Sequence, residues 1–458
     1  PLSLNQEFLC VFDQGELRGA FGHRHTLVAG WRVAGPVEPA LLRQALADVV
    51  VRHETLRTEI VREAQPRHQV VHPPIPVELT IRDLPTPDGA TQDGATPDGA
   101  TRETVAELLV NELDAGIYPV GRLPHLRAVL GRFDADDAVL VLIAHHTATD
   151  SWSMQLLIRD LATCYAARRG GAAPEAAPVA QDPVAQDPVA QYQEFATWQL
   201  ANLDDEATTE ARAYWREHLA GARILALASD RPSSEPASGT FAVLRFHLDA
   251  ELTAAVVRLA TAVRGTPFMV LLAAYNLLLA RRTGQSDIVV PTFTSGRYQE
   301  RFLETVGPFF NFVPLRTDLT GCTSFREMVA RTRATCLEAY SNDIPFALVA
   351  GDSPDLVAPF AEPDRSVFAF ELLQSSTSME SELVGDLKYS EIRRRLISQP
   401  VAADIPDGAL WALDVLPGGE TVGSLKYHTD RFDERTMTDL VAEYQQVLRD
   451  AVGDPDRR

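Results

Sequence analysis

Uninterrupted apolar runs and helically spaced apolar positions alternate along the first part of the chain. The run 138–144 (AVLVLIA) predicts a buried strand, because a half-exposed strand would alternate apolar with polar residues. Apolar residues recur at helical spacing over 37–50, directly after the helix breaker Pro36, and predict a helix. Strands that alternate with packed helices are typical of an α/β fold.

The second part of the chain shows the same alternation. Asp249 can cap a helix with an apolar 3.6-residue period, which Gly265 ends. A strongly apolar helix is predicted over 267–282, closed by Gly284, and a short strand over 287–290. A final helix carries the apolar stripe Met437, Leu440, Val441, Tyr444, Val447 and Leu448. We expect such stripes to form core, and the chain to fold into two similar α/β lobes.

Two low-complexity stretches interrupt this pattern. Residues 85–101 repeat an Asp-Gly-Ala-Thr unit, whose spacing does not supply the alternating ligands of a calcium loop, so we expect a flexible surface insertion. Residues 178–191 repeat Pro-Val-Ala-Gln, which is typical of an extended linker. We therefore predict an N-terminal lobe over 1–177, a linker-like loop over 178–191 and a C-terminal lobe over 192–458.

Composition and charge narrow the class of protein. The formal net charge of −21 argues against nucleic-acid binding, because phosphate contacts need a basic face. The four cysteines lack CxxC spacing, which argues against a zinc site or a disulfide framework and favours reduced thiols. No run approaches the roughly 20 apolar residues of a membrane span, and the opening PLSL lacks the features of a signal peptide. We expect a cytoplasmic protein with neither a metal nor a membrane partner.

The sequence HHTATD at 145–150 is the strongest candidate for chemistry. It directly follows the predicted strand 138–144, so His145 and His146 should be held at the edge of a core by a rigid element. Imidazole can accept or give a proton near neutral pH, and Asp150 lies close enough in sequence to orient a ring or anchor the loop. Such a pair can equally be a core histidine pair satisfied by backbone carbonyls.

The chain resembles the condensation domains of nonribosomal peptide synthetases, which have the chloramphenicol-acetyltransferase-like fold. The resemblance runs almost end to end and rests on HHTATD at 145–150, RHETLRT at 52–58, YQEFATW at 192–198, GR at 296–297, VGPFFN at 306–311 and PLR at 314–316, with weaker matches in SLNQ at 3–6, DIPF at 343–346 and DRS at 364–366. It implies two lobes that form a pseudo-dimer, with the active site in a tunnel at their interface.

The resemblance also implies a reaction. Condensation domains transfer an acyl group, held as a thioester on a carrier protein's phosphopantetheine arm, to an acceptor. It makes His146, the second histidine of the motif, the catalytic residue. It implies that Asp150 forms a structural ion pair with Arg57, and that the pair braces the loop. His145 is expected to support the core. Two further residues, Gly307 and Asn311, are expected near the tunnel as substrate-binding residues.

One position departs from the family pattern. The family has glycine after the aspartate of the motif, and this chain has Ser151. A serine still offers its backbone N–H as an oxyanion donor if its φ is ordinary, and it adds a hydroxyl near the reacting carbon. We expect Ser151 and Ser153 to contribute to the substrate pocket. A tolerated exchange of one small residue for another is the alternative.

Absent motifs narrow the reaction further. The signatures of epimerisation, heterocyclisation and plant-type acyltransferase relatives are not found, and no adenylation domain is present. We expect a free-standing enzyme in natural-product biosynthesis, resembling the ester-forming enzymes of enediyne antibiotic pathways, although an excised synthetase domain would look identical. An alcohol acceptor is slightly favoured over an amine. The alternatives are a coenzyme A-dependent acyltransferase and a catalytically silent carrier-binding scaffold.

Carrier proteins are usually acidic, so an acidic enzyme needs local basic patches to bind them. The candidates are Arg393, Arg394 and Arg395, and a helix with Arg326, Arg331 and Arg333. Each can equally be an ordinary solvated face. The expected partners are a carrier protein and a small-molecule acceptor.

Overall fold

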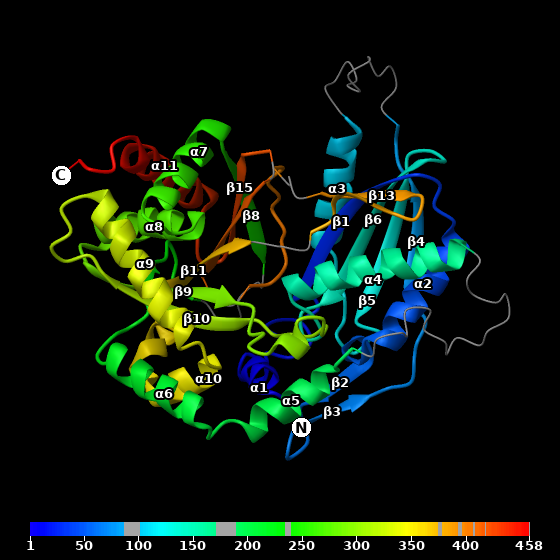
Figure 1. The fold of residues 1–458 in the computed structure, drawn as a ribbon, viewed down its shortest axis with the longest axis horizontal. Coiled ribbons are helices and arrows are strands. Elements are labelled where there is room, and N and C mark those ends of the chain that lie inside the picture. The colour runs from blue at the N-terminus through cyan, green and yellow to red at the C-terminus, as the bar shows by residue number, and fades with distance from the viewer. Residues whose placement is uncertain are drawn as a thin grey trace. The chain divides into compact units, whose positions relative to one another are not determined.

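The computed structural model describes residues 1–86, 101–170, 189–233, 240–373, 378–392, 396–405, 408–416 and 418–457. The repeat at 85–101 and the linker at 178–191 therefore lie almost wholly outside the described residues. The chain divides into two compact units, each with helices packed on a β-sheet (Figure 1). Unit 1 comprises 1–201, 297–309 and 375–397, and unit 2 comprises 202–296, 310–374 and 398–458.

These units differ from the predicted lobe boundaries of 1–177 and 192–458. Residues 192–201, 297–309 and 375–397 belong to the N-terminal unit although they follow the predicted linker. Strand pairing explains the last of these segments, because a strand within it pairs with the first strand of the chain, Trp31 opposite Glu391. The pairing covers a row of backbone donors and acceptors that would otherwise form a sheet edge.

Unit 1 is built on a six-stranded sheet of order β12-β13-β1-β6-β5-β4. Its helices are α1 (Leu4–Val11), α2 (Pro39–Arg52), α3 (Arg102–Asp114), α4 (Ser151–Arg169) and α5 (Tyr192–Ala201), with short 3-10 turns η1 (Glu54–Arg57) and η2 (Glu300–Phe302). The sheet strands are β1 (Thr26–Ala34), β4 (Glu78–Asp83), β5 (Leu126–Arg132), β6 (Asp137–His145), β12 (Glu380–Val384) and β13 (Leu387–Glu391), and β2 (Thr58–Val61) and β3 (His68–Val71) form a separate hairpin.

Strand β6 lies between β1 and β5 and is buried on both faces, which confirms the strand predicted over 138–144 and explains its unbroken apolar run. One face packs against α2 and α4, through Leu140 and Leu142 of the strand. The other packs against α3, through Val141 and Ile143. The predicted helix over 37–50 is confirmed as α2. A strand fixed on both faces is a rigid support for the residues that follow it.

Unit 2 is built on a five-stranded sheet of order β7-β11-β14-β15-β8, in which only β11 and β14 run parallel. The strands are β7 (Ala226–Ala228), β8 (Phe241–Leu248), β11 (Arg365–Leu373), β14 (Ala409–Val415) and β15 (Thr421–His428), and β9 (Asp287–Thr294) and β10 (Asn311–Asp318) form a ribbon. The helices are α6 (Glu206–His218), α7 (Ala250–Ala262), α8 (Pro267–Thr283), α9 (Phe325–Ser341), α10 (Phe346–Asp352) and α11 (Glu434–Gly453), with a 3-10 segment η3 (Pro354–Ala361).

The elements predicted for this part of the chain are confirmed. Asp249 caps α7 by accepting a hydrogen bond from the backbone of Leu252, and Gly284 ends α8 in the left-handed conformation at φ 72°. Aromatic rings of α8, α11 and the sheet form the core, with Tyr275 stacked on Phe370 at 4.7 Å between ring centroids.

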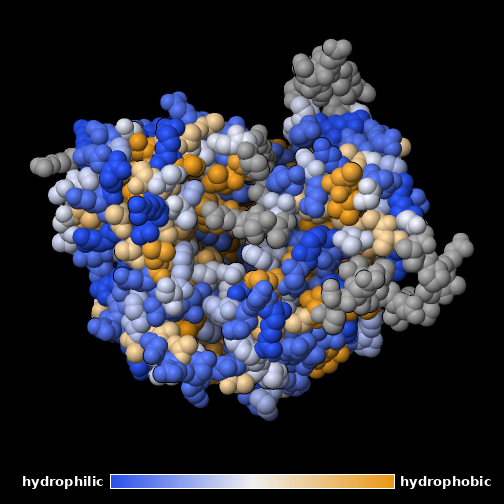
Figure 2. Space-filling view, in the orientation of Figure 1, coloured by the Kyte–Doolittle hydropathy of each residue, from blue (hydrophilic) through white to orange (hydrophobic). Residues whose placement is uncertain are grey.

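Each unit is therefore α/β, as predicted, with helices packed on a β-sheet. Figure 2 shows mostly hydrophilic residues on the visible face of each unit, with smaller apolar areas among them. Within the described residues no single helix is long and apolar enough to cross a membrane, although α7 and α8, bent by 105°, pass that test as a pair.

Candidate active site

The loop between β6 and α4 carries the histidine motif. The backbone N–H of His146 donates to the carbonyl of His25 at 2.9 Å, which extends the pairing of β6 with β1 by one residue. The N–H of Ala148 and the hydroxyl of Thr149 both donate to the His145 carbonyl, at 3.0 and 3.1 Å. The loop is thus a tight turn anchored to the strand end.

His145 lies inside the core of unit 1, where its side chain is 2% exposed. Its Nδ1 bonds to the Thr147 hydroxyl at 2.9 Å and its Nε2 to the Gly22 carbonyl at 3.0 Å. Burial, with a smaller contribution from His125, lowers the pKa of His145 from 6.5 to about 3. A ring that stays neutral and has both nitrogens engaged supports the loop and does not exchange protons at neutral pH.

His146 is only partly buried and is held differently. Its Nδ1 bonds to the Thr149 carbonyl at 2.8 Å, and since a carbonyl can only accept, Nδ1 carries the hydrogen in the neutral ring. The lone pair therefore lies on Nε2. The His146 ring also stacks on the ring of His25, with centroids 4.8 Å apart and planes 15° from parallel. This arrangement can orient Nε2 as a proton acceptor.

Asp150 pairs with Arg297, which corrects the predicted pair with Arg57. The Arg297 guanidinium donates to both carboxylate oxygens of Asp150, at 2.6 and 3.2 Å, and both side chains are almost wholly buried. Asp150 also caps α4 through the Ser153 N–H at 2.7 Å and accepts from the Phe309 N–H at 3.2 Å. The bracing role of Asp150 is therefore accounted for by a different arginine.

Arg57 has other partners because it ends the 3-10 turn η1 on the side of the β2–β3 hairpin. Its guanidinium donates to the carbonyls of His72 at 2.6 Å and Val50 at 3.3 Å, and forms an ion pair with Glu54 at 3.4 Å. Arg297 reaches Asp150 because residues 297–309 join unit 1. The motif GR at 296–297 is visible in the sequence, but nothing in it indicates this partner.

Ser153 and Gly307 act together inside unit 1 and not as walls of a pocket, which corrects their expected place in substrate binding. The hydroxyl of Ser153, which is 0% exposed, donates to the Gly307 carbonyl and accepts from the Gly307 N–H and from Arg297, each at 3.0 Å. A Cβ on Gly307 would lie 2.0 Å from the Tyr192 ring, so glycine is needed for close packing.

Ser151 is exposed and begins α4, directly after the capping Asp150. It has no positive φ, so the glycine usual at this position is not needed for the backbone conformation. The first N–H groups of a helix lack partners within the helix and lie at the positive end of its dipole. The Ser151 N–H therefore remains a candidate oxyanion donor.

Asn311 lies in unit 2, where it braces the start of β10. Its side-chain amide donates to Asp343 at 2.8 Å and to the Ile344 carbonyl at 2.7 Å, and its Oδ1 accepts from the Phe346 N–H at 2.8 Å. It is 4% exposed. These contacts join the motifs VGPFFN and DIPF and give Asn311 a structural task in place of the expected substrate contact.

Sequence reasoning missed two further histidines of this site. His25 directly precedes β1 and His125 directly precedes β5, while His145 ends β6. Because these three neighbouring strands alternate in direction, their histidines lie side by side at the same end of the strands. Ring centroids of His125 and His145 are 5.9 Å apart, and burial lowers the pKa of His125 to about 4. Neither β1 nor β5 is among the strands predicted from the sequence, so the histidines that precede them carried no signal. No group of metal-ligating side chains is found among the described residues.

The basic patches give little support for carrier docking. Arg326 forms an ion pair with Asp456, and Arg331 and Arg333 donate to the carbonyls of Asp318 and Arg264. Residues 393–395 lie outside the described part of the chain.

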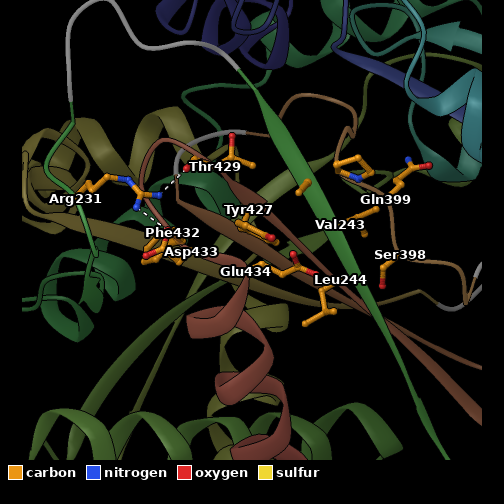
Figure 3. Close-up of a pocket in the computed structure, with 12 residues that line it drawn as sticks. Arg231, Val243, Leu244, Ser398, Gln399, Tyr427, Thr429, Phe432, Asp433 and Glu434 are labelled. Carbon is orange, nitrogen blue, oxygen red and sulfur yellow. Dashed lines mark hydrogen bonds and ion pairs between the residues drawn. The ribbon is translucent and has the colours of Figure 1, made fainter.

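A hollow of about 390 Å³ lies in unit 2 at the junction of β15 and α11 (Figure 3). Two charged residues of its lining are paired, because Arg231 donates to Asp433 at 2.7 Å, and Arg231 also donates to the Thr429 carbonyl at 2.8 Å. On the other side of the hollow, Gln399 and Val243 are joined by two backbone hydrogen bonds of 3.0 and 3.1 Å. No histidine lines this hollow among the described residues.

The fold defines one class of protein, the domains with the chloramphenicol-acetyltransferase-like fold. More narrowly, the chain belongs to the condensation-domain family, whose family model matches residues 22–458. Condensation domains of this family occur in nonribosomal peptide synthetases that make natural products.

Individual relatives agree with this assignment. The probable non-canonical nonribosomal peptide synthetase CymA of Salinispora arenicola is 32% identical over the whole of this chain, which spans only 6% of that relative's length. The SgcC5 protein from Streptomyces globisporus, crystallised in complex with (R)-(-)-1-(2-naphthyl)-1,2-ethanediol and sucrose, is 44% identical, with a TM-score of 0.91 and coverage of 100% of this chain and 99% of SgcC5. The X-domain from teicoplanin biosynthesis, solved in complex with OxyB, is 27% identical with a TM-score of 0.72, over 100% of this chain and 94% of that one.

Proposed function

We propose that this domain transfers an acyl or aminoacyl group from the phosphopantetheine thioester of a carrier protein to an alcohol, and so forms an ester. His146 is the general base of this reaction. The observation that carries the proposal is the hydrogen bond from His146 Nδ1 to the Thr149 carbonyl, because it leaves Nε2 as the basic nitrogen.

In the proposed reaction one imidazole both removes the proton and later returns it. Nε2 takes the proton of the attacking hydroxyl as the new C–O bond forms at the thioester carbon. The tetrahedral intermediate then collapses, the C–S bond breaks, and the imidazolium returns its proton to the leaving thiolate. General-base help of this kind is worth roughly 10²–10⁴ in rate.

Two features of unit 1 support this role. The buried pair of Asp150 with Arg297 fixes the start of α4, and the N–H of the exposed Ser151 at that start can donate to the oxyanion. His145, whose pKa is lowered to about 3 by burial, does not compete for the proton at neutral pH.

The preference for an alcohol rests on the similarity to SgcC5. That protein was crystallised with a vicinal diol, a compound with two hydroxyls and no amine. A domain 44% identical to it over its whole length is therefore expected to accept a similar nucleophile.

A matched pair of acceptors tests the proposal. One is 1-(2-naphthyl)-1,2-ethanediol, and the other is the diamine in which both hydroxyls are replaced. Each is incubated with a carrier protein loaded with a set of α- and β-aminoacyl groups, and the products are measured by mass spectrometry. We expect product from the diol and little from the diamine. Product from the diamine alone would overturn the ester proposal, and equal product from aminoacyl-coenzyme A would overturn the need for a carrier.

A second candidate, a scaffold that binds a partner protein without catalysis, is favoured by the complex of the similar X-domain with OxyB. His146→Ala separates the two functions. Catalysis predicts a loss of turnover with carrier binding retained, whereas a scaffold would lose nothing that either assay measures.

A further inference from the structure

His25 occupies a place that the motif does not describe. It directly precedes β1, and the register of β1 with β6 sets Thr26 opposite His145, so that His25 lies beside His146. The two residues are far apart in the sequence and are brought together only by the sheet. His25 is 8% exposed, so its ring is enclosed on nearly all sides.

The contacts of His25 fix both the backbone and the ring of His146. The His25 carbonyl accepts the His146 N–H at 2.9 Å, and the two rings stack with centroids 4.8 Å apart. His25 is itself held by a turn, because its N–H donates to the Gly22 carbonyl at 3.0 Å. The same carbonyl bonds to His145 Nε2, so the Gly22 carbonyl links His25 to the motif as well.

A catalytic imidazole needs such support because rotation about its second side-chain torsion is broad and has weak intrinsic preferences. The bond from Nδ1 to the Thr149 carbonyl fixes one point of the ring but permits tilting about that bond. A flat ring stacked at 15° opposes the tilt. Together the two contacts fix the plane in which Nε2 points.

We propose that His25 is a positioning residue for His146, and that its flat ring holds the plane from which Nε2 accepts the proton. The inference rests on the proposed function, since it gives His25 a task only if His146 acts as a base. His25 itself transfers no proton in this scheme. What it supplies is a planar surface, which another aromatic ring can supply as well.

Three substitutions test the planar surface. His25→Leu and His25→Gln remove the flat ring with modest changes of volume, and His25→Phe keeps it. The matched control is His23→Leu, in the same segment, for which no described contact joins the ring to His146. We expect kcat to fall about 10–100-fold in the Leu and Gln variants, the loss associated with a misplacement of about 1 Å, with KM for the loaded carrier unchanged. The Phe variant should stay within about threefold of the parent, as should the control.

A spectroscopic readout separates positioning from loss of folding. The ¹⁵N resonances of His146, assigned by comparison with His146→Ala, should report the Nδ1–H tautomer in the parent and in His25→Phe. In His25→Leu the Nδ1–H tautomer should persist, because the Thr149 carbonyl sets it, but the resonances should broaden as the ring samples tilted orientations. Equal loss of kcat in the Phe and Leu variants, or His146 resonances as sharp in the Leu variant as in the parent, would overturn the proposal even if one variant melts early.

A double substitution separates this inference from the proposed function. If His25 acts through His146, adding His25→Leu to His146→Ala should cost no further activity. A further loss would show that His25 acts by another route. Full activity of His146→Ala itself would overturn the proposed function instead, while the widths of the His146 resonances would still report whether His25 orients the ring.

Discussion

The two units contain the same strand–loop–helix corner, but they equip it differently. In unit 1, β6 ends at His145, Asp150 precedes the helix, and α4 begins at Ser151. In unit 2, β15 ends at His428, Asp433 precedes the helix, and α11 begins at Glu434. The spacing from the strand-end histidine to the aspartate is identical, so the corner is a product of the fold.

Two of the differences between the corners bear on the proposed chemistry. The residue after the strand-end histidine is His146 in unit 1 and Thr429 in unit 2. The aspartate of unit 1 is paired with a fully buried arginine, whereas Asp433 and its partner Arg231 are 62% and 44% exposed. The comparison indicates that the fold supplies the corner twice, and that one loop residue and one buried ion pair distinguish the corner of unit 1, the proposed active site, from that of unit 2.

Exchanging the loop residue should have the largest effect. His146→Thr gives the corner of unit 1 the residue found in unit 2, and we expect turnover to fall about 10²–10⁴-fold, because the general base is lost. The measurement is the rate of ester formation from a loaded carrier. The matched control is Thr429→Ala, which should leave the rate unchanged. A comparable loss in both variants would mean that the two corners are not functionally distinct.

Removing the aspartate of each corner should show how much more a buried ion pair contributes to the free energy of unfolding than an exposed one. We expect Asp150→Ala to lower the free energy of unfolding by about 3–5 kcal/mol, because Arg297 is left as a buried and unbalanced charge. Asp433→Ala should cost at most about 1 kcal/mol, because solvent screens the exposed pair with Arg231. Urea unfolding of both variants measures the difference. Equal destabilisation would contradict the view that burial distinguishes the corners.

The histidine row of unit 1 should make this unit sensitive to acid. Burial lowers the pKa of His125 to about 4 and that of His145 to about 3, so the unfolded chain binds more protons than the folded one below pH 6.5. Stability is therefore lost as the pH falls from 6.5 towards 4, by about 1.4 kcal/mol per pH unit for each ring.

The variant His125→Gln tests this dependence. The glutamine Nε2 can keep the hydrogen bond to the Thr58 carbonyl, which His125 Nε2 makes at 3.0 Å, but it cannot be protonated. Urea unfolding between pH 7 and pH 4.5 should show a slope smaller by the contribution of one ring. An unchanged slope would mean that His125 titrates alike in the folded and unfolded chains.

The elements that local patterns in the sequence predicted are confirmed by the structure. The unbroken apolar run predicted β6 because a strand covered on both faces has no polar positions, and Asp249 and Gly284 marked helix ends through their own side-chain and backbone chemistry. The unit boundaries could not be predicted in this way, because β13 pairs with β1 although the two strands lie far apart in the sequence. The local sequence of either strand does not indicate its partner.

The site was predictable only as far as its motif. His146 follows from HHTATD, but the partner of Asp150 depends on the path of residues 297–309, which local spacing does not determine. His25 was missed for a similar reason, since it lies beside His146 only through the register of two strands. Residues recruited by tertiary pairing leave no periodic signal in the chain.

The smallest effect is expected at the first residue of the helix in each corner. Ser151 stands where the family has glycine, and its φ is not positive, so the glycine conformation is not required here. We expect Ser151→Gly to lower the free energy of unfolding by less than about 1 kcal/mol, because glycine loses more backbone entropy at a helical position. Glu434→Gly, at the matching position of unit 2, should cost a similar amount.

If the serine contributes only its backbone N–H, turnover of Ser151→Gly should stay within about threefold of the parent. A larger loss, with stability as expected, would assign a role to the Ser151 hydroxyl and would mean that the two corners differ at a third point.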